Sequence, residues 1–368
     1  MNRNPILFRV DATPEAGYER LARCMVFSAA LQRRRRPTHF LSQLDPRHLA
    51  LPVKRIGNEW IPAEHPAGSF DDLGQVLQQV RKLKPAAIVL DAETPQDYLC
   101  ELAATGTFLV SLDHQGLLPF PGQLLLNPLL GPSRESYEFT PGAQVLMGRR
   151  YTLVRPEIRR HRPTRAQEPA PLPAPAGKAG SGQFRALVAL GEDDPNGKTL
   201  ELTKLMLAMP KVGRVDVVLR REHPDFDKLQ DLATQQPERL ELAIDPPEIV
   251  ARIVRCHFAV TNGSGWSLEL ACVGVPQLMI LQQESHWPNA QRMEEEGCAS
   301  CLGWHENVSA QTIRLAVQNL LTDPLERQAM ARNGRKLIDG RGADRIVNGL
   351  EIMLHRPTPT IGTMEMAA

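Results

Sequence analysis

Short apolar runs and amphipathic stretches alternate along the first part of the chain. Residues 6–10 (ILFRV) are mostly apolar and predict a strand, and residues 20–31 place apolar side chains on one face of a helix. The alternation continues with strands at 38–41, 86–90 and 107–112 and with helices at 73–84 and 95–104. Because strands that alternate with helices form parallel sheets covered by helices, this part predicts an α/β domain.

The same pattern restarts at residue 184. Strands are predicted at 184–190, 215–219, 240–244, 258–261 and 277–281. Helices are predicted at 200–209, 249–255, 267–273, 289–296, 309–321, 325–333 and 343–354. The second half therefore predicts a second α/β domain, and the fold class is α/β with two Rossmann-like domains.

A change of composition separates the two halves. Residues 156–183 are rich in Pro, Ala, Gly and Arg, and the run PAPLPAP at 169–175 cannot build a core. We therefore expect a first domain at 1–155, a stiff, solvated linker at 156–183 and a second domain at 184–355. The tail, 356–368, is expected to be disordered.

Composition and charge exclude several classes of protein. A formal net charge of +1 gives no field that would attract nucleic acid, and no apolar run reaches the roughly 18 residues that span a bilayer. The first residues lack a signal-peptide pattern, so we expect a cytoplasmic protein. Cys298 and Cys301 have CxxC spacing without further ligands for zinc, which favours a structural pair at a helix-to-strand junction.

Two glycine turns lie between predicted strands and helices. The first, GEDDPNGKT at 191–199, has five residues between its glycines where a P-loop has four, and its acidic residues would repel phosphate. This excludes a P-loop ATPase and favours a turn whose acidic residues cap a helix.

The second turn, TNGSGWSLE at 261–269, is a better candidate for ligand binding. The N–H groups of Gly263, Ser264 and Gly265 can approach an anion at a helix N-terminus. Glu269, on the first turns of that helix, can accept hydrogen bonds from two ribose hydroxyls. The alternative is a tight glycine turn followed by a surface glutamate.

Polar residues also follow several predicted strands. Asp11, Asp91 and Asp113 end strands of the first domain and together indicate a polar cleft, where His114 can act as a general base. His286 lies in a polar loop after a strand of the second domain, where open α/β sheets bind ligands. The alternatives are a structural His114 and an ordinary loop histidine at position 286.

The run of arginines at 33–36 has two interpretations, and three catalytic motifs are absent from the chain. The four arginines at 33–36 are interpreted as a solvated helix end, with peripheral contact to anionic lipid as the alternative. GxSxG, HExxH and dinucleotide GxGxxG motifs are absent, which argues against triad hydrolases, zincins and dehydrogenases.

Several segments resemble known families. FRVDA at 8–12, Gly17 and Arg23-Cys24 resemble the opening of the UDP-sugar hydrolases of pseudaminic acid biosynthesis and of the related spore-coat polysaccharide proteins. The same resemblance covers 126–127, Gly148, 151–157 and 339–345. Residues 263–269, 274–276 and 286–290 are similar to the donor site of the peptidoglycan N-acetylglucosaminyltransferase.

The resemblance implies a GT-B fold, in which two Rossmann-like domains face each other across a cleft. It implies that the second domain binds the nucleotide-sugar and that the final helix returns towards the first domain. It places Glu269 at the ribose and residues 263–265 at the diphosphate. It also places Gly191, His286 and Asn289 in the donor site.

Three pocket motifs depart from the hydrolase pattern. The family's Gly-His pair is Glu19-Arg20 here, and an arginine that stays protonated cannot activate water as that histidine would. Its Asp-His-Tyr is Asp91-Ala92-Glu93, and its Gly-Gly-Ser/Thr-Asp turn is GEDD at 191–194. The departures argue against the same hydrolysis by the same mechanism.

The sequence therefore favours an enzyme that transfers sugar from a UDP-sugar donor to a glycan or sugar acceptor in surface polysaccharide assembly. Asp11, Glu19, Asp113 or His114 would supply the base, and Arg20 would stabilise the leaving diphosphate without a metal or other cofactor. Two alternatives remain: a UDP-sugar hydrolase with a relocated base such as His114, and a binding protein without catalysis.

Overall fold

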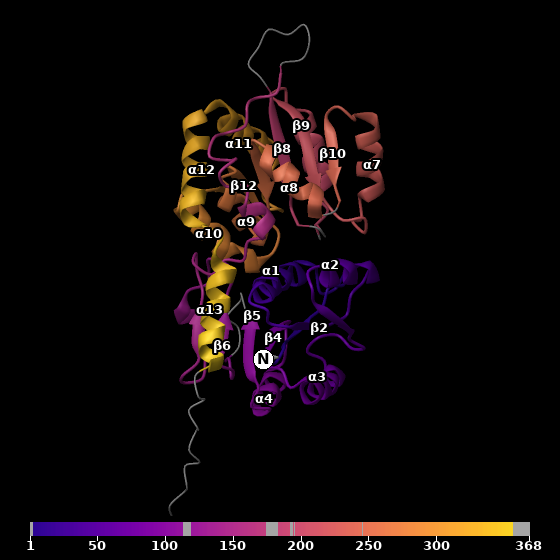
Figure 1. Cartoon of the computed structure of the whole chain (residues 1–368). Helices are drawn as coiled ribbons and strands as arrows, with labels where there is room; N and C mark the ends of the chain where they lie inside the picture. The colour runs from indigo at the N-terminus through magenta and orange to yellow at the C-terminus, as the bar shows by residue number, and fades with distance from the viewer. Residues whose placement is uncertain are drawn as a thin grey trace, which may run out of the picture.

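The computed structural model describes residues 3–112, 119–173, 183–191, 194, 196–244 and 246–355. Its architecture consists of two parallel sheets, each covered by helices, with one sheet in each half of the chain (Figure 1). All the strand pairings of both sheets in the described residues are parallel, which confirms the expected pair of Rossmann-like α/β domains.

The first sheet has the strand order β3-β2-β1-β4-β5-β6-β7. Every residue of β1 and β4 is buried, because helices cover both faces of the sheet at its centre. Its strands are β1 (Ile6–Val10), β2 (Thr38–Ser42), β3 (Glu59–Pro62), β4 (Ala87–Asp91), β5 (Phe108–Leu112), β6 (Leu124–Leu126) and β7 (Gln144–Leu146). Its helices are α1 (Glu19–Arg33), α2 (Ala50–Arg55), α3 (Phe70–Leu83) and α4 (Gln96–Ala104), with 3-10 turns η1 (Arg47–Leu49) and η2 (Arg134–Ser136).

The second sheet has the strand order β10-β9-β8-β11-β12-β13. Its strands are β8 (Phe184–Ala189), β9 (Val212–Val218), β10 (Leu240–Ala243), β11 (Phe258–Thr261), β12 (Gln277–Leu281) and β13 (Ser300–Trp304). Its helices are α6 (Thr199–Leu207), α7 (Phe226–Gln235), α8 (Pro246–Arg255), α9 (Gly265–Val273), η3 (Glu284–His286), α10 (Trp287–Glu295), α11 (Ala310–Thr322) and α12 (Pro324–Leu337). None of the described helices combines the length and the apolarity that a membrane crossing needs.

The last helix, α13 (Gly342–His355), leaves the second domain and packs against α1 of the first (Figure 1). Its polar face engages the arginine run, since Arg33 pairs with Asp344 at 2.7 Å and Arg36 with Glu351 at 2.6 Å. The side chain of Arg36 is almost fully buried. The interpretation of 33–36 as a solvated helix end is therefore corrected for Arg36, which is buried against α13, whereas Arg33, Arg34 and Arg35 are exposed as expected.

The segment that follows β7 also differs from the expected linker. It forms α5 (Pro156–Arg159), whose Ile158 is fully buried in the core of the second domain. Arg162 donates to the carbonyl of Cys272 at 2.5 Å, and Arg165 donates to that of Cys256 at 2.6 Å. The start of the segment is thus anchored to the second domain rather than solvated, while 174–182 lies outside the described residues.

The strand order identifies where ligands are expected to bind. In each sheet the chain starts at a central strand, moves to one edge, and then returns to fill the other side, so the order reverses between β1 and β4 and between β8 and β11. In open α/β sheets the crevice beyond the carboxyl ends of the strands at such a reversal is the usual ligand site. We therefore expect the ligand site near the loops that follow these four strands, in the space between the domains.

Candidate functional site

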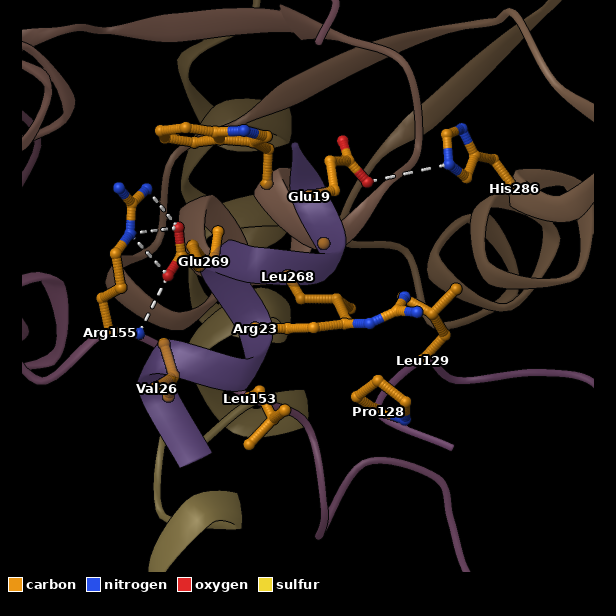
Figure 2. Close-up of a pocket in the computed structure, with 13 residues that line it drawn as sticks. Glu19, Arg23, Val26, Pro128, Leu129, Leu153, Arg155, Leu268, Glu269 and His286 are labelled. Atoms are coloured by element: carbon orange, nitrogen blue, oxygen red, sulfur yellow. Dashed lines mark hydrogen bonds and ion pairs between the residues drawn. The ribbon is translucent and has the colours of Figure 1, made fainter. Parts of the chain in front are cut away.

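A pocket lies between the two domains. The first domain contributes Glu19 and Arg23 from α1, and the second contributes residues 265, 266, 268 and 269 of α9 and His286 of η3 (Figure 2). It encloses about 80 Å³ and also has Pro128, Leu129, Leu153 and Arg155 in its wall. The helices that follow β1 and β11 thus meet at one place, as the two strand-order reversals predict.

The turn between β11 and α9 depends on glycine. Gly263 has φ +81°, and a Cβ on it would come within 3.1 Å of the Ala290 Cβ, so a side chain there would be strained by the backbone conformation and crowded by Ala290. Asn289 donates to the Gly263 carbonyl at 2.6 Å and accepts from the Leu130 N–H at 3.1 Å. Asn289 therefore holds the turn and also links it to the first domain.

The adjacent turn after β8 is tied to the same place. Gly191 has φ +103°, and Asn262 donates to the Leu190 carbonyl at 2.9 Å, so the two turns are fixed to each other. Ser264 lies at the N-cap of α9, and its buried Oγ has no hydrogen-bond partner among the described residues. The Ser264 N–H donates to the Asn262 Oδ1 at 3.1 Å and the Ser267 N–H to the Ser264 carbonyl at 3.0 Å, so the N–H groups of Gly265 and Trp266 are the ones left for an anion among the described residues.

One carboxylate of the acidic turn at 191–194, that of Asp194, is buried in the protein. Asp194 is buried and accepts from the Thr199 N–H at 2.5 Å, so it caps α6. Although burial opposes its charge, the His223 imidazole, whose Nε2 lies 3.6 Å from the carboxylate, and the hydrogen bond from Thr199 lower the pKa of Asp194. The cap expected from the sequence is confirmed for this residue; Glu192 and Asp193 lie outside the described residues.

Glu269 is buried and fully engaged by Arg155. It accepts from the Arg155 backbone N–H at 2.8 Å, from Nε at 3.0 Å and from Nη2 at 2.5 Å (Figure 2). The Arg155 guanidinium also lies 4.1 Å above the ring centroid of Trp266. The alternative of a surface glutamate is therefore wrong, and the proposed ribose-binding carboxylate is held by an arginine of the first half of the chain.

On the other wall, Glu19 and Arg23 lie one turn apart on α1 and point into the pocket (Figure 2). Arg23 donates from Nε to the buried Asp91 carboxylate at 2.6 Å. Burial opposes the charge of Arg23, but Asp91 outweighs it and raises the pKa of the guanidinium. Asp91 is thus committed to orienting Arg23, and Arg23 is a fixed positive charge at the edge of the pocket.

His286 supplies a neutral imidazole opposite Glu19. Its Nε2 lies 4.0 Å from the Glu19 Oε2, and its buried Nδ1 has no hydrogen-bond partner among the described residues (Figure 2). Burial, together with the positive charge of Arg23, lowers the pKa of His286 to about 4. The ring is therefore uncharged at neutral pH, and the negative charge of this part of the pocket comes from Glu19.

The other expected base and anion-stabilising residues are placed differently. Asp11 is buried and accepts from Arg9, from the Gln43 N–H at 2.8 Å and from the Ala67 N–H at 2.7 Å. Its inclusion as a base is corrected, because both its oxygens fasten loops of the first domain and it does not line the pocket. Arg20 pairs with Glu93 at 2.7 Å, outside the pocket lining. Asp113 and His114 lie outside the described residues.

Arg23 and Arg155 line the pocket but were not selected from the sequence. Arg23 stands four residues after Glu19 in a helical pattern, and this spacing could have placed both on one face. Arg155 precedes a proline and no local pattern marks it, because its partner Glu269 is 114 residues away.

No family model matches the chain. The spore coat polysaccharide biosynthesis protein SpsG of Bacillus subtilis (strain 168) is 25% identical over 163 residues. This match covers 44% of the chain and 48% of SpsG, so it spans about half the length of the curated relative.

Solved structures match nearly the whole chain. MurG of Acinetobacter baumannii has a TM-score of 0.62 at 10% identity, covering 95% of this chain and all of that chain. The spinosyn rhamnosyltransferase SpnG complexed with thymidine diphosphate has a TM-score of 0.62 at 17% identity, and the match covers 94% of this chain and 100% of SpnG. The UDP-GlcNAc 2-epimerase of Neisseria meningitidis bound to UDP-GlcNAc has 0.62 at 14% identity, covering 95% and 100%.

The chain has the GT-B fold. At these identities the structural matches show the fold alone, and they include both a rhamnosyltransferase and an epimerase. The distinction between such activities must therefore be argued from the residues of the pocket.

Proposed function

We propose that this protein is a nucleotide-sugar-dependent glycosyltransferase of surface-polysaccharide assembly, which binds a UDP-sugar between its domains and transfers the sugar to a glycan or sugar acceptor. The observation that carries the proposal is the meeting of the start of α9 with the face of α1 that carries Glu19 and Arg23 in one pocket. The partial similarity to a polysaccharide biosynthesis protein supports the class of pathway.

The donor is assigned to the second domain. The N–H groups at the start of α9 face the diphosphate, because a helix N-terminus favours negative charge. Glu269 accepts hydrogen bonds from the ribose hydroxyls once Arg155 has moved away from it. A cavity of about 80 Å³ is smaller than the roughly 300 Å³ at which ligand sites begin, so donor binding requires the domains to separate.

Glu19 is assigned as the base. Its carboxylate takes the proton of the acceptor hydroxyl while that oxygen bonds to the anomeric carbon and the bond from this carbon to the diphosphate oxygen breaks. His286, which its lowered pKa keeps neutral, lies opposite Glu19 and adds no positive charge beside the carboxylate. Arg20 can reach the leaving diphosphate only after releasing Glu93, so we assign it a secondary role.

Calorimetry with UDP, and with GDP and ADP as controls, tests the donor site. We expect selective UDP binding that Glu269→Gln weakens about tenfold, because the amide loses the charge that holds the ribose. Glu295→Gln, on the exposed side of α10, is the matched control and should bind as the wild type does. Failure of the wild type to bind any of the three nucleotides would overturn the proposal.

A second assay separates binding from turnover. UDP release from UDP-glucose and UDP-N-acetylglucosamine is measured with and without monosaccharide acceptors. Glu19→Gln should retain UDP binding and lose acceptor-dependent UDP release by at least a hundredfold. Release that is independent of acceptor would instead favour a hydrolase, and binding without release would favour a non-catalytic protein.

A further inference from the structure

A second pocket lies on the second domain, away from the space between the domains. Its wall includes Gly274 and Pro276, which precede β12, and the face of α12 that carries Arg332 and Arg335. The interdomain pocket instead lies beyond the carboxyl ends of the strands, so the two pockets lie at opposite ends of the strands of the second sheet. We call this one the α12 pocket; its volume is about 330 Å³.

The α12 pocket carries an excess of positive charge. Arg165, Arg332 and Arg335 line it, and none of the three makes an ion pair with the residues that the structure describes. Its one carboxylate, Glu168, is already paired with a fourth arginine, Arg327, at 2.7 Å. The three remaining guanidinium groups therefore have no carboxylate at ion-pair distance in the described chain, and Glu168 attracts Arg165 only from further away.

The electrostatics of Arg335 reflect this excess. Burial lowers its pKa, and the positive charges of Arg162, Arg165 and Arg332 lower it further. Burial also lowers the pKa of Arg165. Like charges brought together in a partly desolvated site raise the free energy of the empty pocket, and a bound anion would relieve this repulsion.

Several donors of these arginines are unused. The terminal nitrogens of Arg165 donate to backbone carbonyls, but its Nε is buried without an acceptor, and the residue is only 3% exposed. Arg335 donates through Nη1 to the Arg165 carbonyl at 3.0 Å, which leaves its Nε and Nη2 available. Arg332 makes no hydrogen bond in the described chain. A buried donor without an acceptor costs free energy that a ligand can recover.

A glycine makes the arrangement possible. Gly274 ends α9 with φ +81°, and a Cβ on it would overlap the Arg335 guanidinium. Arg335 therefore reaches across the end of α9 only because residue 274 has no side chain. This brings its fork close to Arg165, on the opposite wall of the pocket.

We propose that the α12 pocket binds a small organic phosphate. Guanidinium forks match the geometry of phosphate oxygens. The pocket holds three arginines besides Arg327, which already pairs with its one carboxylate. A volume of about 330 Å³ lies within the range of small-molecule sites and leaves room for an organic body beside the phosphate. The proposal does not depend on the function of the interdomain pocket, with which it shares no residue.

Calorimetry with glucose 6-phosphate, inorganic phosphate and glucose tests this site on the full chain. We expect glucose 6-phosphate to bind, glucose not to bind, and Arg332→Gln and Arg335→Gln each to weaken binding at least fivefold. Arg314→Gln, an exposed arginine on α11, removes the same charge outside the pocket and should bind as the wild type does. Absence of phosphate binding, or equal losses in Arg332→Gln and Arg314→Gln, would overturn the proposal.

Two further arms identify the source of the phosphate and separate the two sites. Co-sedimentation with phosphatidylcholine vesicles with and without phosphatidic acid tests a lipid headgroup; vesicle binding that Arg332→Gln abolishes, without binding of glucose 6-phosphate, would overturn the small-molecule assignment. Because UDP also carries phosphate, its titration is repeated on Arg332→Gln. Binding lost in Glu269→Gln but kept in Arg332→Gln belongs to the interdomain pocket.

Discussion

Burial decides the protonation state of His286. The ring lies in the wall of the interdomain pocket, near the fixed charge of Arg23 and 4.0 Å from the Glu19 carboxylate. Desolvation and Arg23 together lower its pKa to about 4, and the attraction of Glu19 does not outweigh them. A histidine that appeared in the sequence as one polar residue of a loop is therefore a neutral group in the folded protein.

This lowered pKa predicts a loss of stability in acid. In the unfolded chain His286 takes up a proton near its ordinary pKa of about 6.5, whereas in the folded protein it does so only near 4. The unfolded state therefore binds more protons between these values, and stability falls as pH drops from about 6.5 to about 4, by at most about 3 kcal/mol.

Urea unfolding at pH 7 and pH 4.5 measures this contribution. The wild type should lose about 2 to 3 kcal/mol more than His286→Asn between the two pH values. The exposed His48 provides the control, since His48→Asn should retain the wild-type dependence on pH. Equal pH dependence in wild type and His286→Asn would show that the folded protein protonates His286 normally.

At the scale of single residues, sequence reasoning found groups but not their partners. Glu269 was selected from its place after a glycine turn, and the structure shows it bound by Arg155, which is 114 residues away in the chain. Asp11 was selected because it follows a strand, and the structure shows its oxygens bound by Arg9 and two loop N–H groups. Both partnerships depend on tertiary contacts that no local pattern records.

Helices and strands could be predicted from the sequence where their apolar residues form a continuous run or recur with the period of a helix. The buried central strands β1, β4 and β8 gave clear apolar runs, and α1, α11 and α13 gave clear amphipathic patterns. The strands β6 and β7 have only three residues each, too few to show a period, and β3 is only partly buried. The helix α7 was missed because it has one buried residue and an otherwise polar sequence.

The crossing of α13 to the first domain depends on close approach at its start. A Cβ on Gly342 would lie 2.7 Å from the Tyr151 carbonyl carbon and 2.8 Å from the Thr152 nitrogen, and backbone cannot move aside as a side chain can. Gly342→Ala should therefore lower the free energy of unfolding by about 1 to 3 kcal/mol, measured by urea unfolding.

Gly349 offers a matched control on the same helix. A Cβ there would meet only the Leu146 Cδ1, at an ordinary contact distance of 3.5 Å. Gly349→Ala should therefore be neutral or stabilise the protein by about 0.5 to 1 kcal/mol, because alanine favours helix over glycine. A Gly342→Ala protein as stable as Gly349→Ala would contradict the proposed close contact.

At the scale of the whole molecule, the sequence predicted two α/β domains but not how their edges meet. Alternating strands and helices are consistent with many strand orders, and only the structure shows that both sheets reverse order between their central strands. The pocket forms because α1 and α9 both begin at these reversals and approach each other. Their meeting depends on α13 and on the contacts of Arg155 and Asn289, which are long-range in sequence.

The ion pair between Arg155 and Glu269 links the separation of the domains to the affinity for UDP. Under the proposed function, this pair occupies the ribose-binding carboxylate and belongs to a closed state that cannot admit the donor. The measured dissociation constant for UDP is then the intrinsic constant divided by the fraction of molecules in the open state. Weakening the closed state should therefore strengthen apparent UDP binding.

Arg155→Ala tests this relation by calorimetry with UDP and by urea unfolding. We expect UDP affinity to rise about threefold or more, while the free energy of unfolding falls by about 3 kcal/mol, because Glu269 loses its charged partner in a buried position. Arg160→Ala, an exposed neighbour, removes the same charge and should change neither. A fall in UDP affinity would show instead that Arg155 contacts the nucleotide, so that its pairing with Glu269 prepares the donor site rather than closing it.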